Sequence, residues 1–394
     1  MRGTISKKGN RWYAVIYDGI NSDTGKPIRR WVAAGTRRTD AERVLADLVQ
    51  RKYGGEPVVK EKLTVGDYLL FRWLPIQKTR LRETTYDSYA RNIHLHVVSV
   101  LGRKRLVNLT VEDIDHFYAM LLTDGRKEQR DGANPGLSPK TVRNIHVMLN
   151  KAMVDAQRKG LVARNVVALA DAPSSKADAH RRIKAWNANQ LGTFLETISQ
   201  HRLHPAYHLS SHTGMRRGEL LGLRWCDLDL DAGRLSVRQA LVSVAYEMQI
   251  SDVKTGASQR TIDLDPKTVE VMRRWSATRL AEKGGIAISP DDLVFVKENG
   301  AWPHPQTVSQ LFDRTVAKTD LPRVALHDLR HTHATLLLKA GVPVKVVSER
   351  LGHTNVAFTM SCYQHVLPGM QAEAAAMFAD IIDSGMRRHP PSQE

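Results

Sequence analysis

The chain has 394 residues, which is too long for one ordinary core and fits two or three domains. Its 42% hydrophobic and 25% charged residues are typical of a folded soluble protein, and two cysteines, Cys226 and Cys362, are too few for a disulfide framework or a cysteine-based zinc site. No apolar run approaches the roughly 20 residues that span a bilayer, and the first ten residues lack the apolar core of a signal peptide. We therefore expect a cytoplasmic protein.

The charge balance is strongly basic. Lysine and arginine number 58 against 41 aspartate and glutamate, which gives a formal net charge of +17. Such an excess favours a polyanionic partner, although simple solubility or contact with an anionic membrane would also accommodate it. Membrane binding usually needs one basic amphipathic helix or a polybasic tail. Here the basic residues are spread along the chain, which favours a long nucleic-acid footprint.

Residues 1–56 form a small unit of their own. Two runs rich in aromatic and β-branched residues, 11–17 and 28–33, flank a turn-prone segment and predict two strands. A helical pattern follows over 39–52, with Thr39 as its cap.

A small basic sheet backed by one helix can lay its strands in a DNA groove. The unit holds twelve Lys/Arg against six Asp/Glu, and Arg11, Arg29 and Arg30 are its candidate DNA contacts. The alternative is a packing module with a solvated basic edge.

After a linker at 54–57, residues 63–172 show an all-helical pattern. Thr64 and Thr110 each stand where a helix cap is expected, and 84–97 is another helix. The polar, glycine-rich segment 123–136 predicts a loop. Ser138-Pro139 then opens a helix that runs to about Lys159.

The outward face of that last helix is basic. It includes Lys140 and Arg143, which we take as candidate contacts with the DNA backbone. A solvated charged face is the simpler interpretation of the same pattern.

The rest of the chain is predicted as a linker, one large domain and a tail. The linker, 173–185, is rich in Pro, Ser and Lys. The domain, 186–384, is mainly helical with strand-like runs at 234–244, 259–264 and 292–296. An amphipathic helix is expected at 369–383, and 385–394 as a disordered tail.

Arg216 lies in a segment, 213–225, that is typical of a capped helix start. Thr213 is the expected cap, which puts Arg216 in the first turn, where backbone N–H groups and the helix dipole favour a phosphate. Glu219 stands three residues later on the same face and can hold the guanidinium. Taken alone, the pattern at Arg216 would favour an ordinary surface arginine on an amphipathic helix.

Lys254 lies on a turn between two strand-like runs. A lysine at a hairpin tip is usually just exposed. It can also swing toward a phosphate or a leaving oxygen as a mobile proton donor.

Four further residues suit chemistry on a phosphodiester. His327 and Arg330 share one helical face, His353 follows a short second helix at 344–351, and Tyr363 comes ten residues later. Together they provide a cation for phosphate oxygens, imidazoles for protons and a hydroxyl for attack.

The same segment also admits a metal interpretation. His327 and His331 stand four residues apart, like the pair in H-E-x-x-H. The residues between them are Asp-Leu-Arg, so the catalytic glutamate is missing and an arginine would repel Zn²⁺. We therefore expect no metal and no cofactor.

The pattern resembles that of the tyrosine recombinases, in particular the phage-type and integrative-element integrases. Their signature is Arg, Lys, His-x-x-Arg, His and Tyr in that order. The positions that match it here are Arg216 in Thr-Gly-x-Arg-x-x-Glu-Leu, Lys254, His327, Arg330, His353 in Leu-Gly-His and Tyr363, with Glu219 as a supporting acidic residue.

The resemblance implies a fold that is mainly α with small β elements. Its parts would be a β-sheet-plus-helix arm-binding domain, a helical core-binding (SAM-like) domain and a mixed, mostly α catalytic domain. It implies a site-specific recombinase that integrates and excises a mobile element, such as a prophage or integrative plasmid. The expected partners are double-stranded DNA with attachment sites, three further copies in a homotetramer on DNA, an excisionase and a DNA-bending accessory protein. No membrane partner is expected, and the enzyme would be associated with the nucleoid.

The resemblance also implies a mechanism. Arg216 and Arg330 would fork onto the non-bridging phosphate oxygens, and His353 would steady the phosphate. Tyr363 would attack as nucleophile, with His327 as proton acceptor or relay and Lys254 protonating the departing 5′-oxygen. The product is a 3′-phosphotyrosine linkage that a 5′-hydroxyl can reverse, so no ATP is needed, and the sequence contains no G-x-x-x-x-G-K-[ST] motif.

Two other functions are compatible with parts of this pattern. A non-catalytic DNA-binding regulator descended from such an enzyme predicts loss of at least one motif residue, and all six are present. A type IB topoisomerase-like enzyme shares the chemistry but relaxes supercoils without pairing two sites. The helix at 369–383 would, by the resemblance, dock on a neighbouring protomer, whereas its simpler role is packing on its own domain.

Overall fold

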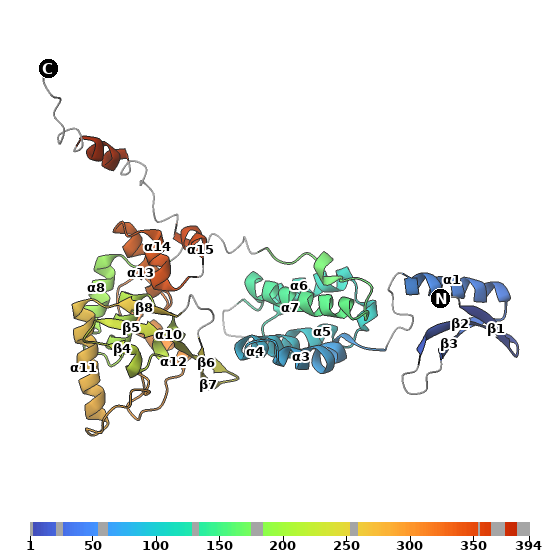
Figure 1. Ribbon diagram of the computed structural model, residues 1–394, viewed down its shortest axis with the longest axis horizontal. Coiled ribbons are helices and arrows are strands. Elements are labelled where there is room, and N and C mark those ends of the chain that lie inside the picture. Colours follow the sequence, from blue (N-terminus) through green and yellow to red (C-terminus); the bar gives the residue numbers. More distant parts are fainter. Residues whose placement is uncertain are drawn as a thin grey trace, which may run out of the picture. The chain divides into compact units, whose positions relative to one another are not determined.

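The structure is a computed structural model, and it describes residues 3–20, 27–53, 62–127, 134–174, 184–252, 259–353, 355–363 and 375–383. The chain divides into two compact units, residues 1–181 and 182–394 (Figure 1). Helices predominate and the sheets are small, so the predicted fold class is confirmed.

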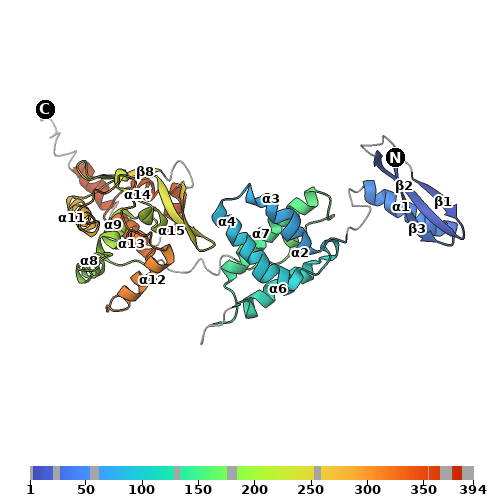
Figure 2. The ribbon, with the colours of Figure 1, turned by 90° about the horizontal axis from the view of Figure 1, so that it is seen from below.

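The first unit begins with an antiparallel sheet of three strands, β1 (Thr4–Lys8), β2 (Arg11–Ile20) and β3 (Pro27–Gly35), in the order β1-β2-β3. Helix α1 (Arg38–Tyr53) packs against it (Figure 2). The sequence predicted β2, β3 and α1 but missed β1, whose five residues carry little apolar signal. The helix already includes Arg38, so Thr39 lies inside α1 and is not its cap.

The two faces of this sheet differ. One face packs Ala14 and Ile16 of β2 against Leu48 of α1. Because successive strand residues point to opposite faces, Tyr13 lies on the other, open face. There its ring meets that of Trp31 edge to face at 6.0 Å, and Trp31 is 48% exposed.

The helical part of the first unit contains two long helices and several short, irregular segments. The elements are α2 (Val65–Asp67), a π-helical turn (Tyr68–Trp73), α3 (Leu74–Lys78), α4 (Glu83–Asn92), a second π-helical turn (Ile93–Val97), α5 (Val98–Leu101), a 3₁₀ turn (Leu106–Asn108), α6 (Val111–Asp124), α7 (Pro139–Arg158) and a 3₁₀ turn (Val167–Leu169).

The three helix starts predicted here are confirmed. Thr64 and Thr110 each form a capping box with the aspartate three residues later, and Ser138 accepts from the backbone N–H of Thr141. These side chains satisfy N–H groups that a helix start leaves unpaired. The linker at 54–57 and positions 128–133 of the expected loop lie outside the described residues, and α6 extends to Asp124.

Buried aromatic residues tie the helices of this part to α7. Tyr68 Oη donates to Ala152 O at 2.8 Å, and Trp73 Nε1 donates to Asp155 Oδ2 at 2.9 Å. Both rings are buried in one apolar cluster with Phe117 of α6. The π-helical turn Tyr68–Trp73 is therefore fixed to the C-terminal half of α7.

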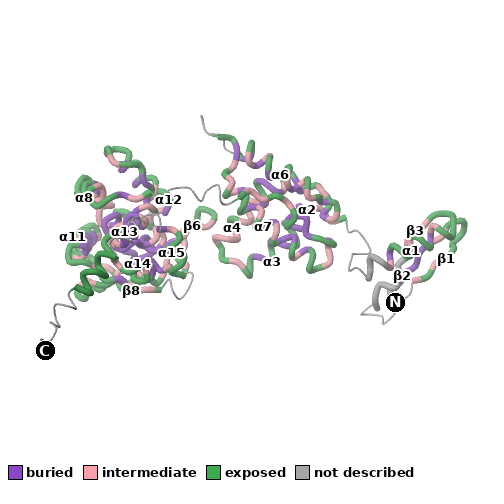
Figure 3. Tube along the Cα trace, turned by 90° about the horizontal axis from the view of Figure 1, so that it is seen from above, coloured by how far each residue is buried: buried purple, intermediate pink, exposed green. Residues whose placement is uncertain are grey.

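The second unit is mostly helical. Its helices are α8 (Ala188–Thr197), α9 (His204–Thr213), α10 (Arg217–Leu221), α11 (Pro266–Glu282), α12 (Pro305–Val316), α13 (Asp328–Lys339), α14 (Val344–Leu351) and α15 (Val356–Tyr363), with a 3₁₀ turn at Trp225–Asp227. The interior of this unit contains α13, and both α13 and α14 carry buried residues (Figure 3).

The strands of this unit form a sheet and a separate hairpin. The sheet orders β4 (Leu228–Asp229), β5 (Arg234–Val237) and β8 (Arg260–Asp263), and the hairpin pairs β6 (Gln239–Val244) with β7 (Glu247–Asp252), all antiparallel. The expected run 234–244 is two strands, β5 and β6. The expected strand at 292–296 is wrong: only Leu293 makes an isolated bridge, with Arg224, because this segment has no neighbouring strand along its length.

Four further expectations fall partly or wholly outside the described residues. Of the linker 173–185, positions 175–183 are outside, and the tail 385–394 is outside entirely. Of the helix at 369–383, residues 375–383 are described, and they are helical and exposed. Lys254 also lies outside. No helix in the described part of the chain combines the length and the apolar character needed to cross a membrane.

Candidate active site

Arg216 lies at a tight junction between two helices. Helix α9 ends at Thr213, Gly214 adopts the left-handed conformation with φ of 65°, and Arg216 is the N-cap of α10. The expectation that Thr213 caps the helix of Arg216 is therefore wrong, because a glycine in the left-handed region ends one helix before the next begins. The adjacent Arg217 donates to Ser309 Oγ of α12 instead, at 2.8 Å.

Glu219 joins two arginines in the interior. It is 4% exposed, and its Oε1 lies 2.7 Å from Arg216 Nη1 while its Oε2 lies 2.9 Å from Arg260 Nη2. Burial raises the pKa of this carboxyl, but the hydrogen bonds and charges of Arg260 and then Arg216 outweigh it, and the pKa is lowered. The predicted contact between Glu219 and Arg216 is present. Arg260 was not predicted, although on β8 it shares a face with the buried Ile262.

The C-terminal end of α14 binds three arginines. Each of three consecutive carbonyl oxygens accepts from a different side chain: Arg350 O from Arg260 Nε at 2.7 Å, Leu351 O from Arg330 Nη1 at 2.8 Å, and Gly352 O from Arg216 Nη2 at 3.1 Å. The last carbonyls of a helix lack partners within it and carry the negative end of its dipole. They are therefore well suited to hold guanidinium groups.

Arg330 is the most enclosed of these cations. It is 3% exposed, and its Nη1 also donates to Gly214 O at 2.7 Å. Its Nη2 is buried and has no hydrogen-bond partner among the described residues. Burial, then the charge of Arg216, lowers the pKa of Arg330 to about 9. An anion at this point would satisfy the donor and offset the charge.

The two predicted histidines border this cluster and are neutral at pH 7. His353 Nδ1 is hydrogen-bonded to Thr359 Oγ1 at 2.7 Å, and burial followed by the charges of Arg330 and Arg216 lowers its pKa to about 4. His327 precedes α13 and keeps an accessible edge. Partial burial of its ring, then the charge of His331, lowers the pKa of His327 to about 4.

Tyr363 is the last residue of α15 and is 1% exposed. Its Oη lies 2.7 Å from His331 Nδ1. Burial raises the pKa of the phenol, partly offset by the charge of Arg330. From the sequence, His331 was expected at most as a metal ligand, and His327 was expected to accept the proton of this hydroxyl. The ring of His327 instead lies beside that of His331, with centroids 5.2 Å apart.

The structure thus brings five of the six motif residues into one electrostatically coupled group. Arg330 acts on the pKa of Tyr363, His353 and His327, and Arg216 acts on those of Arg330 and both histidines. Whether Lys254 joins them stays a prediction, because it lies outside the described residues.

The predicted DNA contacts lie in the first unit. Arg11, Arg29 and Lys140 are exposed, and the side chain of Arg30 lies outside the described residues. Arg143 is exposed but donates from Nη1 to Pro173 O at 3.1 Å. Their contact with DNA stays a prediction.

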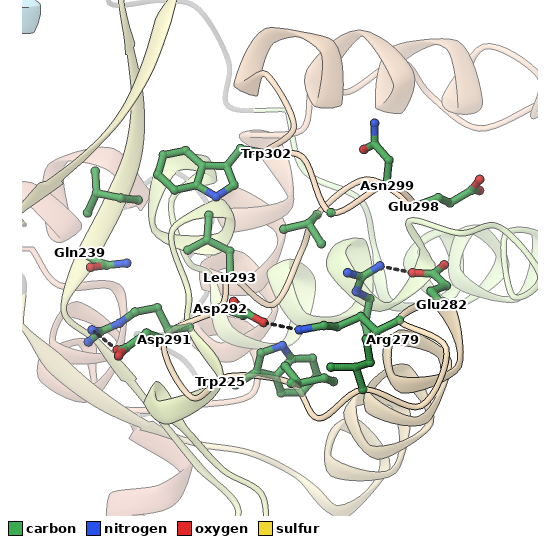
Figure 4. Close-up of a pocket in the computed structure, with 17 residues that line it drawn as sticks. Trp225, Gln239, Arg279, Glu282, Asp291, Asp292, Leu293, Glu298, Asn299 and Trp302 are labelled. Atoms are coloured by element: carbon green, nitrogen blue, oxygen red, sulfur yellow. Dashed lines mark hydrogen bonds and ion pairs between the residues drawn. The ribbon is translucent and has the colours of Figure 1, made fainter.

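The second unit also has a cavity of about 800 Å³ (Figure 4), and none of the described motif residues lines it. Trp225, Leu293 and Trp302 contribute apolar surface to it, and its cations are engaged by acids. Lys283 Nζ lies 3.0 Å from Asp292 Oδ2, and the pairs Arg224–Asp291 and Arg279–Glu282 are also formed. The cavity therefore lacks the open positive charge that a DNA phosphate would need. Within the described ranges, no group of three or more His, Cys, Asp or Glu side chains is placed to hold a metal ion.

Two family models match the chain in its two units. The model described as "Phage integrase family" matches residues 181–369, which include the whole motif, and "Phage integrase, N-terminal SAM-like domain" matches residues 67–122. The chain belongs to the phage integrase family of tyrosine recombinases. It is a site-specific DNA recombinase, as the motif predicted.

Relatives of this recombinase align along nearly its whole length. A tyrosine recombinase XerC-like protein of Caldanaerobacter subterraneus subsp. tengcongensis is 25% identical over 95% of this chain and 98% of its own. The ICEBs1 integrase of Bacillus subtilis is 26% identical over 96% and 100%. The integrase of Mycobacterium phage D29 is 25% identical over 87% and 88%.

Solved structures have the same fold. A Tn1549 transposon integrase in complex with a circular intermediate DNA matches with a TM-score of 0.65 at 21% identity, covering 80% of this chain and 99% of that one. A lambda integrase from a tetramer bound to a Holliday junction matches with a TM-score of 0.58 at 18% identity, covering 90% and 94%.

Proposed function

We propose that this recombinase cuts and rejoins DNA through a 3′-phosphotyrosine linkage formed by Tyr363, and so integrates and excises a mobile element such as a prophage or an integrative plasmid. The observation that carries this proposal is the convergence of Arg216, Arg330 and His353 with Tyr363. It gives one phosphate two guanidinium groups, a hydrogen-bond partner and a nucleophile.

The two arginines bind the scissile phosphate. Arg330 keeps Nη2 for it, because Nη1 is held by Gly214 O and Leu351 O. Arg216 is more open, with 39% of its side chain exposed, and is fixed by Glu219 and Gly352 O. Two fixed cations stabilise the additional negative charge that develops on the phosphate oxygens during attack. His353, anchored by Thr359, adds a third hydrogen bond.

The remaining roles concern protons. Lys254 protonates the departing 5′-oxygen, which otherwise leaves as a strongly basic alkoxide. His327 is neutral at pH 7 and lies beside His331, so it can relay a proton at the accessible edge of the site. One phosphoester replaces another, and the 5′-hydroxyl of a partner strand reverses the step. The reaction therefore proceeds without ATP.

The first unit contributes further contacts with the DNA. Arg11 and Arg29 lie on the same face of the N-terminal sheet as Tyr13 and Trp31, which is its open face. Guanidinium groups and an exposed indole suit contact with a DNA groove, which supports an arm-binding role for residues 1–56. In the core-binding domain, residues 63–172, Lys140 and Arg143 on α7 contribute contacts with the DNA backbone of the core site.

The active assembly is a homotetramer on paired attachment sites, helped by an excisionase and a DNA-bending protein. Neighbouring structures are integrases on DNA, and one is a lambda integrase tetramer on a Holliday junction, which supports this assembly. A chromosomal substrate places the enzyme at the nucleoid in the cytoplasm.

Covalent trapping tests the proposal. A suicide duplex that carries the element's own junction, nicked beside the cleavage position, should give a protein–DNA adduct that resists denaturation. Tyr363→Phe should give none while binding the duplex as tightly as the wild type. Tyr246→Phe is the matched control, because that residue is 91% exposed on the β6–β7 turn, and the variant should trap DNA normally.

Two outcomes would contradict the proposal. An adduct formed by Tyr363→Phe would assign the nucleophile elsewhere. Relaxation of supercoiled DNA without any product joining two sites would favour a topoisomerase-like enzyme.

A further inference from the structure

We propose that His331 is the catalytic base that accepts the proton of the Tyr363 hydroxyl during strand cleavage and returns it during strand joining. This inference rests on the proposed function, because it assigns a role within the same reaction. Its starting point is the 2.7 Å contact between His331 Nδ1 and Tyr363 Oη, which joins α13 to the end of α15.

The surroundings of Tyr363 leave His331 as the acceptor. The phenol is almost fully buried, and among the described residues its hydroxyl has no other hydrogen-bond partner. The ring of His327 lies 5.2 Å from that of His331, on the accessible edge of the site.

Other histidines near the site are already engaged. His333, on the same helix, uses Nδ1 for Ser211 O at 2.9 Å and Nε2 for Arg350 Nε at 3.2 Å. His353 uses Nδ1 for Thr359 Oγ1. His331 is thus the imidazole whose recorded hydrogen bond goes to the nucleophile.

The protonation states favour this transfer. Burial lowers the pKa of His331, the charge of Asp328 raises it and that of Arg330 lowers it, so the ring is neutral at pH 7. A neutral ring with its hydrogen on Nε2 accepts at Nδ1 from the Tyr363 hydroxyl. The groups around His331 are Asp328 and Arg330 on α13, His327 just before α13, His353 just after α14, and Tyr363 on α15. Asp328 stabilises the imidazolium that forms.

Strand cleavage breaks one bond for each bond that it forms. The Tyr363 Oη–H bond breaks as the Oη–P bond forms, and the proton moves to His331 Nδ1. The P–O5′ bond breaks, and the leaving 5′-oxygen takes a proton from Lys254. In the joining step a 5′-hydroxyl gives its proton to Lys254 as it attacks phosphorus, the Oη–P bond breaks, and His331 gives the other proton back to Oη.

Variants at one position separate proton acceptance from positioning. In His331→Asn, the carbonyl oxygen stands near the place of Nδ1 and accepts a hydrogen bond, but it is far too weak a base to take the proton. In His331→Leu both properties are lost. His331→Ala leaves space for free imidazole. The control is His333→Asn, which removes a buried imidazole from the same helix without touching Tyr363.

The measurement is the single-turnover rate of covalent adduct formation on the suicide duplex between pH 5 and 9. Both His331→Asn and His331→Leu should slow the rate by about 10²–10⁴-fold, the usual contribution of a general base, with DNA binding retained. The wild-type rate should fall on the acid side as His331 becomes protonated. His331→Asn should lack that fall, and His333→Asn should keep it. Added imidazole should restore the rate of adduct formation in His331→Ala, in proportion to the concentration of neutral imidazole.

Several outcomes would overturn the inference. A near-normal rate and pH profile in His331→Asn would show that the residue only positions the hydroxyl. Faster trapping in His331→Leu would show that it restrains Tyr363. If His331→Leu fails to fold, His331→Asn and the imidazole response still decide. Adduct formation by the wild type tests the proposed function separately. If the wild type forms no adduct, the proposed function itself fails, whatever the variants do.

Discussion

Arg260 Nη2 lies 2.9 Å from Glu219 Oε2, and both side chains are less than a tenth exposed. The same arginine donates from Nε to Arg350 O, so one guanidinium connects β8, α10 and α14. It touches neither Tyr363 nor the other motif residues directly in any hydrogen bond between described residues. It holds Glu219, which in turn holds Arg216.

Removing Arg260 should therefore damage both stability and cleavage. Arg260→Met leaves the buried Glu219 carboxylate with Arg216 alone, and breaking a buried pair in this way costs about 3 kcal/mol. The rate of adduct formation should also fall, because Glu219, which holds Arg216, is no longer fixed by Arg260. The measurements are thermal unfolding and single-turnover trapping. Arg274→Met, which removes an exposed partner of Glu270, should change neither.

Gly352 should tolerate no side chain. Its φ is 68°, and an added Cβ would lie 2.8 Å from Arg260 Nη1. Gly352→Ala therefore combines about 1–2 kcal/mol of backbone strain with displacement of Arg260, and moves the carbonyl that binds Arg216.

Gly341→Ala is the matched comparison for this glycine. Its φ is 79°, but a Cβ there meets nothing within 4 Å, so it should cost the strain alone and leave cleavage intact. Denaturant unfolding and adduct formation measure the two effects. Equal loss of cleavage in both variants would contradict the role of Gly352.

Arg330→Lys should abolish most cleavage despite keeping the charge. The planar guanidinium of Arg330 donates from Nη1 to Gly214 O and Leu351 O and keeps Nη2 for the phosphate. The single nitrogen of a lysine ammonium group cannot fill both places. We expect the single-turnover rate to fall by about 10²–10³-fold, and duplex affinity to change far less. The exposed Arg323→Lys should behave as the wild type in both assays. A normal rate in Arg330→Lys would mean that charge alone suffices.

His333 should make the second unit sensitive to acid. Its neutral ring is satisfied by Ser211 O and Arg350, and burial followed by the charge of Arg350 lowers its pKa to about 3. Because the folded pKa lies below that of the unfolded chain, its stabilisation is complete above about pH 6.5 and is lost as pH falls toward 3.

The loss amounts to about 1.4 kcal/mol per pH unit, or about 2 kcal/mol between pH 6.5 and 5. His333→Gln should flatten this dependence in denaturant unfolding followed at both pH values. The buried His208, whose pKa is also lowered to about 3 by burial first and then by the charge of His212, supplies a remaining slope. An unchanged slope in His333→Gln would contradict the prediction.

Local features of the fold were readable because their causes are local. Thr64, Thr110 and Ser138 satisfy N–H groups within three residues, so sequence spacing alone identifies them as caps. The prediction for Thr213 was wrong, although a hydroxyl residue just before a helical run is typical of a cap. The left-handed turn at Gly214 ends α9 there and moves the cap to Arg216.

The resemblance to the family, the mainly helical fold class and the residue types of the site can be read from the order of residues along the chain, because motifs, periodicity and helix caps are all defined by that order. Tertiary structure decided which groups touch. Arg260, absent from the motif, supports Glu219 across 41 residues, and the carbonyl oxygens of α14 hold three arginines from distant segments. His331, and not His327, meets Tyr363. The physical reason is that burial and hydrogen bonding between distant segments exist only once the helices have packed.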